Sequence, residues 1–166
     1  MKKILSTTII IIILVLSMAG CKKTASNNED FIQIAREEIP VADAETIDIQ
    51  IIASVDKDNR SFVCYMTGNE TQSRSYYALE FKNKGNARYE FVKLYKSMER
   101  GSDIYIQSWR DGYVFIVNND ACMNIQLSYP EGETQLIEVG KLPFLHYAEP
   151  TPLEYKFLDS EGNIIY

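Results

Sequence analysis

Two cysteines and one histidine are the side chains with the most obvious chemical potential in the body of the chain: Cys64, Cys122 and His146. A cysteine nucleophile needs an adjacent base, so His146 would have to lie beside one of the two thiols. The histidine is instead flanked by apolar residues in the segment 142–147, a setting typical of a hydrogen-bonded structural histidine. The sequence has no Gly-x-Ser-x-Gly elbow, no His-Glu-x-x-His pair and no Gly-rich phosphate loop. These residues therefore indicate no catalytic site, no metal site and no cofactor.

The same two cysteines are the candidates for a disulfide. Cys64 is expected on the same strand face as its apolar neighbours two residues away. Cys122, in contrast, is out of phase with the apolar residues Met123, Ile125 and Leu127 that follow it. The two thiols are thus expected to face different ways, which argues against a bridge. Both alternatives, a Cys64–Cys122 disulfide and two free thiols, stay open at this level.

Three oxygen-bearing residues near the C-terminus, Asp159, Glu161 and Asn163, have the spacing of the first ligands of a calcium loop. No glutamate follows them at the distance that such a loop requires. Asp, Asn and Gly are also the residues that tight turns need, so we interpret the segment as a turn.

Tyrosine is the aromatic residue in excess, with 11 Tyr against one Trp. Tyr76 and Tyr77 are adjacent in a predicted strand and therefore point to opposite faces. Trp109, Arg110 and Tyr113 flank an Asp-Gly pair, which is a strong hairpin signal. If exposed, these aromatic rings could stack on a sugar or anchor a partner protein. These five residues are the candidate binding residues, and ordinary sheet packing is the alternative explanation.

Length and charge limit the classes of protein that the chain can belong to. It has 166 residues, 46% of them hydrophobic, which suits one globular domain. The net charge is −6 and the sequence contains no basic block. We therefore do not expect the protein to bind nucleic acid, because neutralising the phosphates needs clustered Lys and Arg.

The N-terminus has the order of a secretory signal peptide: a basic start at Lys2-Lys3, an apolar run over residues 4–18, and then Ala19-Gly20-Cys21. The apolar run is shorter than the roughly 20 residues that span a bilayer. A cysteine directly after Ala-Gly resembles the lipobox of bacterial lipoproteins, although Met18 stands where that motif usually has leucine. The resemblance implies a signal peptide over residues 1–20, a diacyl lipid on Cys21, and a place on the extracytoplasmic side of the cell membrane. An uncleaved anchor and an ordinary signal peptide are the alternatives.

The segment after Cys21 predicts a tether and then a helix. Residues 21–27 are polar and small, and we expect a flexible tether there. Phe31, Ile34, Ala35 and Ile39 form one apolar stripe at helical spacing, and the proline at position 40 ends it. Removal of residues 1–20 leaves a net charge of −8, so this domain is expected to hang from its tether rather than lie on anionic lipid.

The rest of the chain predicts a mainly β domain over residues 28–166. About nine or ten short alternating segments, spaced by turn residues, favour an antiparallel sandwich or open barrel with the one N-terminal helix. In residues 47–55, Ile47, Ile49, Ile51, Ala53 and Val55 alternate with Asp48, Gln50 and Ser54, which predicts a strand with one apolar face. Residues 141–152 contain three prolines and are expected to be irregular. Residues 154–158 and 164–166 are expected to close the chain as a hairpin.

The final hairpin, residues 157–166, resembles the endings of small secreted lipoproteins of Gram-positive bacteria, which share a lipobox, a short helix and β-hairpins. The resemblance implies this architecture and no particular activity. We therefore expect a membrane-anchored, non-catalytic binding domain whose partner is an envelope protein or polymer. A small-ligand or signal-sensing lipoprotein is the alternative. A carboxylate-dependent envelope hydrolase is a third, and it requires two acids about 5–9.5 Å apart.

The lipid anchor can be tested directly. Cells expressing the protein are grown with a palmitate analogue, and the label should appear on the wild-type chain but not on Cys21→Ala, because the thiol is the attachment point. Equal labelling of both chains would contradict the lipobox interpretation.

Overall fold

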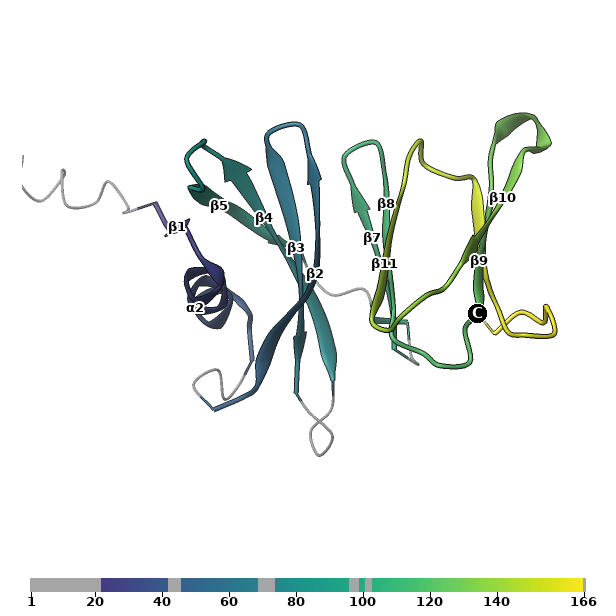
Figure 1. The fold of residues 1–166 in the computed structure, drawn as a ribbon, viewed down its shortest axis with the longest axis horizontal. Helices are drawn as coiled ribbons and strands as arrows, with labels where there is room; N and C mark the ends of the chain where they lie inside the picture. Colours follow the sequence, from purple (N-terminus) through teal and green to yellow (C-terminus); the bar gives the residue numbers. More distant parts are fainter. Residues whose placement is uncertain (1–21, 42–45, 69–73, 96–98, 101–102, 166) are drawn as a thin grey trace, which may run out of the picture.

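The computed structural model describes residues 22–41, 46–68, 74–95, 99–100 and 103–165. The predicted signal peptide and Cys21 lie outside these residues. The described part contains helix α2 and three antiparallel sheets that stack side by side in the order α2, sheet A, sheet B, sheet C (Figure 1). The predicted mainly β fold with one helix near the N-terminus is thus confirmed, and a third sheet is added to the expected sandwich. Among these residues, no helix is both long and apolar enough to cross a membrane.

Each sheet has a simple order of strands. Sheet A runs β1-β5-β4-β3-β2, with β1 (Thr24–Ala25), β2 (Ile49–Lys57), β3 (Arg60–Thr67), β4 (Ser75–Asn83) and β5 (Tyr89–Tyr95). Sheet B runs β11-β8-β7-β6, with β6 (Glu99–Arg100), β7 (Ile104–Trp109), β8 (Gly112–Val117) and β11 (Phe144–Ala148). Sheet C runs β10-β9-β12, with β9 (Asn124–Ser128), β10 (Thr134–Glu138) and β12 (Glu154–Leu158), and a short turn η1 (Pro130–Gly132) precedes β10.

Helix α2 (Asn28–Glu38) begins and ends as its sequence predicts. The side chain of Asn27 caps it by accepting a hydrogen bond of 3.0 Å from the backbone N–H of Asp30. The helix stops before Pro40, which cannot continue it. Its buried stripe, including Ile34 and Ala35, packs on sheet A.

Most of the segment predicted to be a flexible tether is docked on the sheet, so that part of the prediction is wrong for residues 22–25. Thr24 and Ala25 pair with Glu90 and Tyr89 of β5. The Ala25 side chain is 0% exposed and belongs to the core beneath α2. A run of only two strand residues carries no readable periodicity, which is why the sequence did not indicate it.

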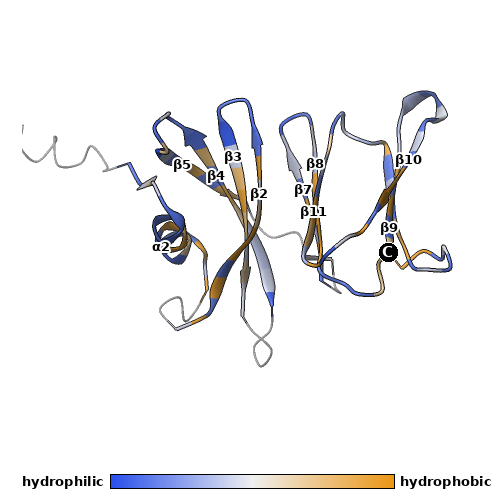
Figure 2. Cartoon of the chain, viewed as in Figure 1, coloured by the Kyte–Doolittle hydropathy of each residue, from blue (hydrophilic) through white to orange (hydrophobic). Residues whose placement is uncertain are grey.

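Sheet B is covered on both faces. Along β8, Val114 and Ile116 pack against sheet A, whereas Phe115 and Val117 pack against sheet C. Hydropathy colouring places apolar residues on the central strands and polar residues at the hairpin tips (Figure 2). The molecule therefore has three cores: one between α2 and sheet A, one between sheets A and B, and one between sheets B and C.

Strand β2 contains a β-bulge that divides its apolar residues between two cores. Its register with β3 shifts after Ile51, which makes Ile52 an extra residue. The prediction that residues 47–55 share one apolar face is therefore wrong beyond the bulge. Ile51 packs beneath α2, whereas Val55 packs against sheet B. The bulge thereby turns Ser54 towards the α2 side.

Strand β11 lies within the segment predicted to be irregular, and that prediction is wrong. All five of its residues pair with β8, from Phe144 opposite Val117 to Ala148 opposite Tyr113. The prolines of this segment fall outside the strand, so each strand residue keeps its backbone N–H. At the C-terminus, the expected final strand is reduced to a single bridge between Leu158 and Ile164, and residue 166 lies outside the described part.

One buried carboxylate lies between sheets A and B. The Glu80 side chain is 8% exposed and accepts a hydrogen bond of 2.6 Å from the Tyr95 hydroxyl. The Arg60 guanidinium lies 3.1 Å from its other oxygen, and the Lys93 ammonium lies at 4.0 Å. A charge removed from water needs such partners. Nearby, the β2–β3 and β7–β8 hairpin tips are joined by an ion pair of 2.7 Å between Asp58 and Arg110.

Gly112 is needed for a close backbone approach. A Cβ atom at this position would lie 2.1 Å from the backbone oxygen of Ala148 and 2.9 Å from the Tyr147 ring. We expect Gly112→Ala to lower the free energy of unfolding by about 1–3 kcal/mol, because β8 and β11 must separate. At Gly140 the nearest atom is 3.8 Å away, so Gly140→Ala is the matched control, expected within about 0.5 kcal/mol of wild type. Urea unfolding measures both, and equal stabilities would refute the close approach.

Candidate binding pocket

Trp109 is a core residue, so its predicted role in an exposed contact surface is wrong. Its side chain is 1% exposed and packs between Phe62 and Tyr147, with ring centroids 5.3 and 5.4 Å away. The reason lies in the register of the hairpin. Trp109 pairs with Gly112, so the loop consists of Arg110 and the residue after it, and the tryptophan faces sheet A.

Arg110 and Tyr113 do not gather with the tryptophan. Arg110 lies at the exposed hairpin tip, where its guanidinium pairs with Asp58. Tyr113 lies on the opposite face of sheet B and packs against Phe115 and Tyr155. The expected aromatic pair across the hairpin is therefore absent, and these residues form no common site.

The two adjacent tyrosines also lie inside the fold. Tyr76 is buried between sheets A and B, where its hydroxyl donates to Asp103 and accepts from the Asn118 amide, both at 2.9 Å. Burial raises the pKa of Tyr76 to about 12. Tyr77 is half-buried against the core beneath α2. They do point to opposite faces, as predicted, but both faces are covered.

Both candidate disulfide partners are free thiols. Cys64 lies in the core between sheets A and B, and Cys122 lies in the core between sheets B and C. Sheet B separates them, so the bridge that the sequence left open does not form. His146 lies on β11, and its pKa is lowered by burial, which disfavours its charged form.

The Asp159 loop is a turn closed by its own side chain. The Asp159 carboxylate accepts hydrogen bonds from the backbone N–H groups of Glu161 and Asn163, at 2.9 and 2.8 Å. The Asn163 side-chain amide also donates to this carboxylate, at 3.1 Å. That bond, together with the backbone bonds, lowers the pKa of Asp159. The interpretation of the segment as a turn is therefore confirmed.

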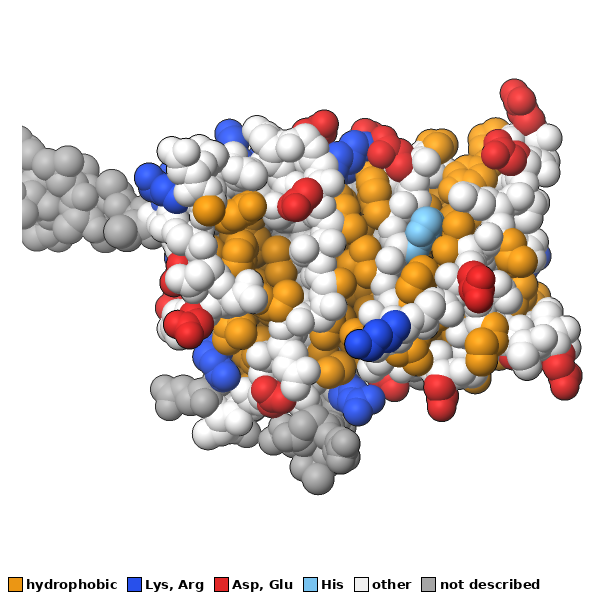
Figure 3. Space-filling model, in the orientation of Figure 1, with side chains coloured by type: hydrophobic (Ala, Val, Ile, Leu, Met, Phe, Trp, Pro, Cys, Tyr) orange, Lys and Arg blue, Asp and Glu red, His pale blue; other side chains and the backbone are white. Residues whose placement is uncertain are grey.

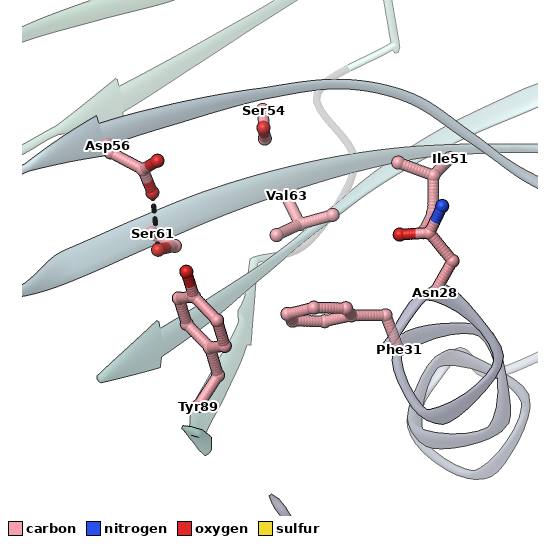
Figure 4. Close-up of a pocket in the computed structure, with 8 residues that line it drawn as sticks. All are labelled: Asn28, Phe31, Ile51, Ser54, Asp56, Ser61, Val63 and Tyr89. Atoms are coloured by element: carbon pink, nitrogen blue, oxygen red, sulfur yellow. Dashed lines mark hydrogen bonds between the residues drawn. The ribbon is translucent and has the colours of Figure 1, made fainter. Parts of the chain in front are cut away.

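A pocket between the start of α2 and sheet A brings together side chains from four elements (Figure 4). Its cavity measures about 130 Å³. The lining residues are Asn28 and Phe31 of α2, Ile51, Ser54 and Asp56 of β2, Ser61 and Val63 of β3, and Tyr89 of β5.

Two aromatic rings make one corner of the pocket. The ring centroids of Phe31 and Tyr89 lie 5.4 Å apart, and the ring planes are tilted by 55°. Phe31 is fixed by an edge-to-face contact of 4.7 Å with Phe81 in the core below. The Tyr89 hydroxyl points towards Ser61 across the pocket (Figure 4).

Polar groups occupy the side of the pocket opposite α2. The Ser61 hydroxyl donates to the Asp56 carboxylate at 2.5 Å. Within the described part of the chain, the hydroxyls of Ser54 and Tyr89 have no hydrogen-bond partner. Asp56 is the single charged residue among the lining residues, so the pocket has negative character.

This arrangement suits a small cationic group. The cavity is well below the 300–1,000 Å³ typical of sites that enclose a whole ligand, so it fits one group of a larger molecule or a very small one. A carboxylate attracts a cation, and the faces of aromatic rings stabilise an alkylammonium in particular. The helix N-terminus beside Asn28 is unfavourable to a cation, but Glu29 and Asp30 in the first turn offset its partial charge.

No family model, no curated protein and no solved structure matches this chain.

The buried thiols give a test of these cores. Thiolate is the reactive form, and burial raises the pKa of both Cys64 and Cys122, so little thiolate exists at pH 8. In a chain carrying Cys21→Ala, native protein should react slowly with a thiol reagent, and urea-unfolded protein should react quickly at both sites. Fast reaction of native Cys64 would contradict its burial.

Proposed function

We propose that this protein is a lipid-anchored, non-catalytic binding domain on the extracytoplasmic side of the cell membrane. The order of residues in the segment 1–21 supports the anchor. Among the described residues, strand β1 begins at Thr24, three residues after the position at which the mature chain of a lipoprotein would start. A diacyl group supplies the two acyl chains that stable membrane attachment requires.

The pocket beneath α2 is the observation that carries the binding role. Its aromatic corner of Phe31 and Tyr89, with the Asp56 carboxylate opposite, favours an alkylammonium group of an envelope polymer or protein. A hydrolase that works with paired acids needs two carboxylates, and Asp56 is the single carboxylate among the lining residues.

A small-ligand or signal-sensing lipoprotein is the second candidate. The small cavity favours it, because 130 Å³ can take up most of a very small amine. The two candidates differ in the molecule that carries the ammonium group, and a free amine that binds as tightly as a polymer-borne one supports the second.

A pair of nearly isosteric probes tests the charge preference. Choline should bind roughly 2- to 30-fold more tightly than neutral 3,3-dimethylbutan-1-ol, since a cation over aromatic faces gains about 0.5–2 kcal/mol. Mature protein in non-ionic detergent is titrated by NMR, with Val63 and Tyr89 as reporters.

Two variants distinguish binding in this pocket from a general attraction of the cation to the acidic protein. Asp56→Asn should remove most of the preference for choline. Asp58→Asn changes another carboxylate of the β2–β3 hairpin, which is paired with Arg110 and lies outside the pocket, and it should leave the preference unchanged. Equal binding of the two probes by wild type would end the proposal for a cationic ligand.

A further inference from the structure

The residues that follow Cys21 are fixed to strand β5. The backbone oxygen of Lys23 accepts a hydrogen bond of 2.9 Å from the Phe91 N–H, and Thr24 and Ala25 continue the pairing along β5. The Lys23 ammonium also pairs with Glu37 at 2.9 Å at the end of α2. Backbone pairing on one side and an ion pair on the other leave this segment little freedom to swing.

Lys22 extends this attachment to within one residue of Cys21. Its ammonium lies 2.7 Å from Glu90, and Lys84 of the β4–β5 hairpin lies 2.9 Å from the same carboxylate. The hydrogen bond from Lys22 and the one from Lys84 lower the pKa of Glu90 to about 2, and the Lys22 bond has the larger effect. Cys21 precedes Lys22 directly in the chain, so a lipid on Cys21 would be joined to the segment that pairs with β5 without an intervening tether.

The exposed side chains around this point suit an anionic bilayer surface. We define the β5 surface as Lys22, Lys84, Arg88, Val92 and Lys93, which belong to β5, its hairpin or the segment docked on it. Four of the five are basic. Val92 is the extra residue of a bulge in β5 and is 40% exposed.

Charge is distributed unevenly along the molecule. Residues 22–95 have ten Lys and Arg against twelve Asp and Glu, a net charge of −2, whereas residues 96–166 have five against eleven, a net charge of −6. Strand β1 lies at the end of the stack opposite sheet C (Figure 1). Acidic side chains predominate over basic ones at the sheet C end of the face in Figure 3. Repulsion from anionic headgroups therefore favours sheet C as the far end.

We propose that the β5 surface faces the bilayer at contact distance, so that sheets A, B and C stack away from the membrane. This inference rests on the lipid anchor of the proposed function. Under this inference the domain has one preferred orientation and does not swing on a tether. Sheet C then lies farthest from the membrane.

Fluorescent probes at two exposed positions test the orientation. Arg88→Cys lies beside β5, far in sequence from the anchor, and Glu161→Cys lies in the turn after β12. The native Cys64 and Cys122 are buried, so the new thiol is labelled selectively. Lipidated full-length protein is reconstituted in phosphatidylcholine and phosphatidylglycerol vesicles that carry a headgroup nitroxide quencher. Quenching should be several-fold stronger at position 88 than at 161, and Lys84→Cys should repeat the result at a second position.

A matched control restores the tether. A Gly/Ser linker of about 20 residues between Cys21 and Lys22, which spans roughly 25 Å on average, should bring the quenching at the two positions close together.

The outcomes separate this inference from the proposed function. Failure of the protein to acquire lipid or to float with vesicles would overturn the anchor itself. Lipidated, vesicle-bound protein with equal quenching at positions 88 and 161 would leave the anchor standing and overturn the orientation.

Discussion

Sheet B lies between two other sheets, so neither of its faces can be polar. Strand β8 meets this constraint with five consecutive apolar residues, 113–117, whose side chains enter the two cores alternately. An antiparallel strand with one solvent-exposed face would alternate apolar with polar residues instead. Polar groups between the layers are consequently paired, as Glu80 is with Arg60, and the Asp58–Arg110 ion pair joins two hairpin tips. The buried Trp109 and the obligatory Gly112 both follow from the close packing of this middle layer.

Much of the fold could be predicted because local signals agree with the tertiary structure. Strand β12 has the predicted bounds, since turn residues flank it on both sides. Strand β11 was missed because prolines surround it. Its extended conformation is stabilised by backbone pairing with the edge of β8, and no local sequence pattern reports that pairing. The two residues of β1 owe their conformation entirely to β5. The third sheet was likewise not foreseen, because strand spacing says nothing about how many layers the strands form.

The candidate site was much less predictable than the strands. Phe31 was recognised as part of an apolar helical stripe, and that pattern does not indicate that it shares a pocket with Asp56. The bulge at Ile52 decides which β2 side chains face α2, and the Ile51-Ile52 pair that interrupts the alternation does not by itself reveal a bulge. Trp109 shows the converse error. Strand β7 ends at Trp109, before the turn, but sheet A covers the face on which the tryptophan lies, and no pattern within the hairpin reports that layer.

Three open sheets leave six edge strands, β1, β2, β6, β10, β11 and β12, among the described residues. Strands β1 and β6 have only two residues each, β2 is interrupted by its bulge, and β11 is bounded by Pro143 and Pro150. Such features disfavour pairing between the edges of separate molecules. Copies confined to one surface in a common orientation would meet edge to edge at high local concentration. Under the proposed orientation at the bilayer, the short, interrupted or proline-flanked edges of β1, β6, β2 and β11 would therefore disfavour aggregation within the plane of the membrane.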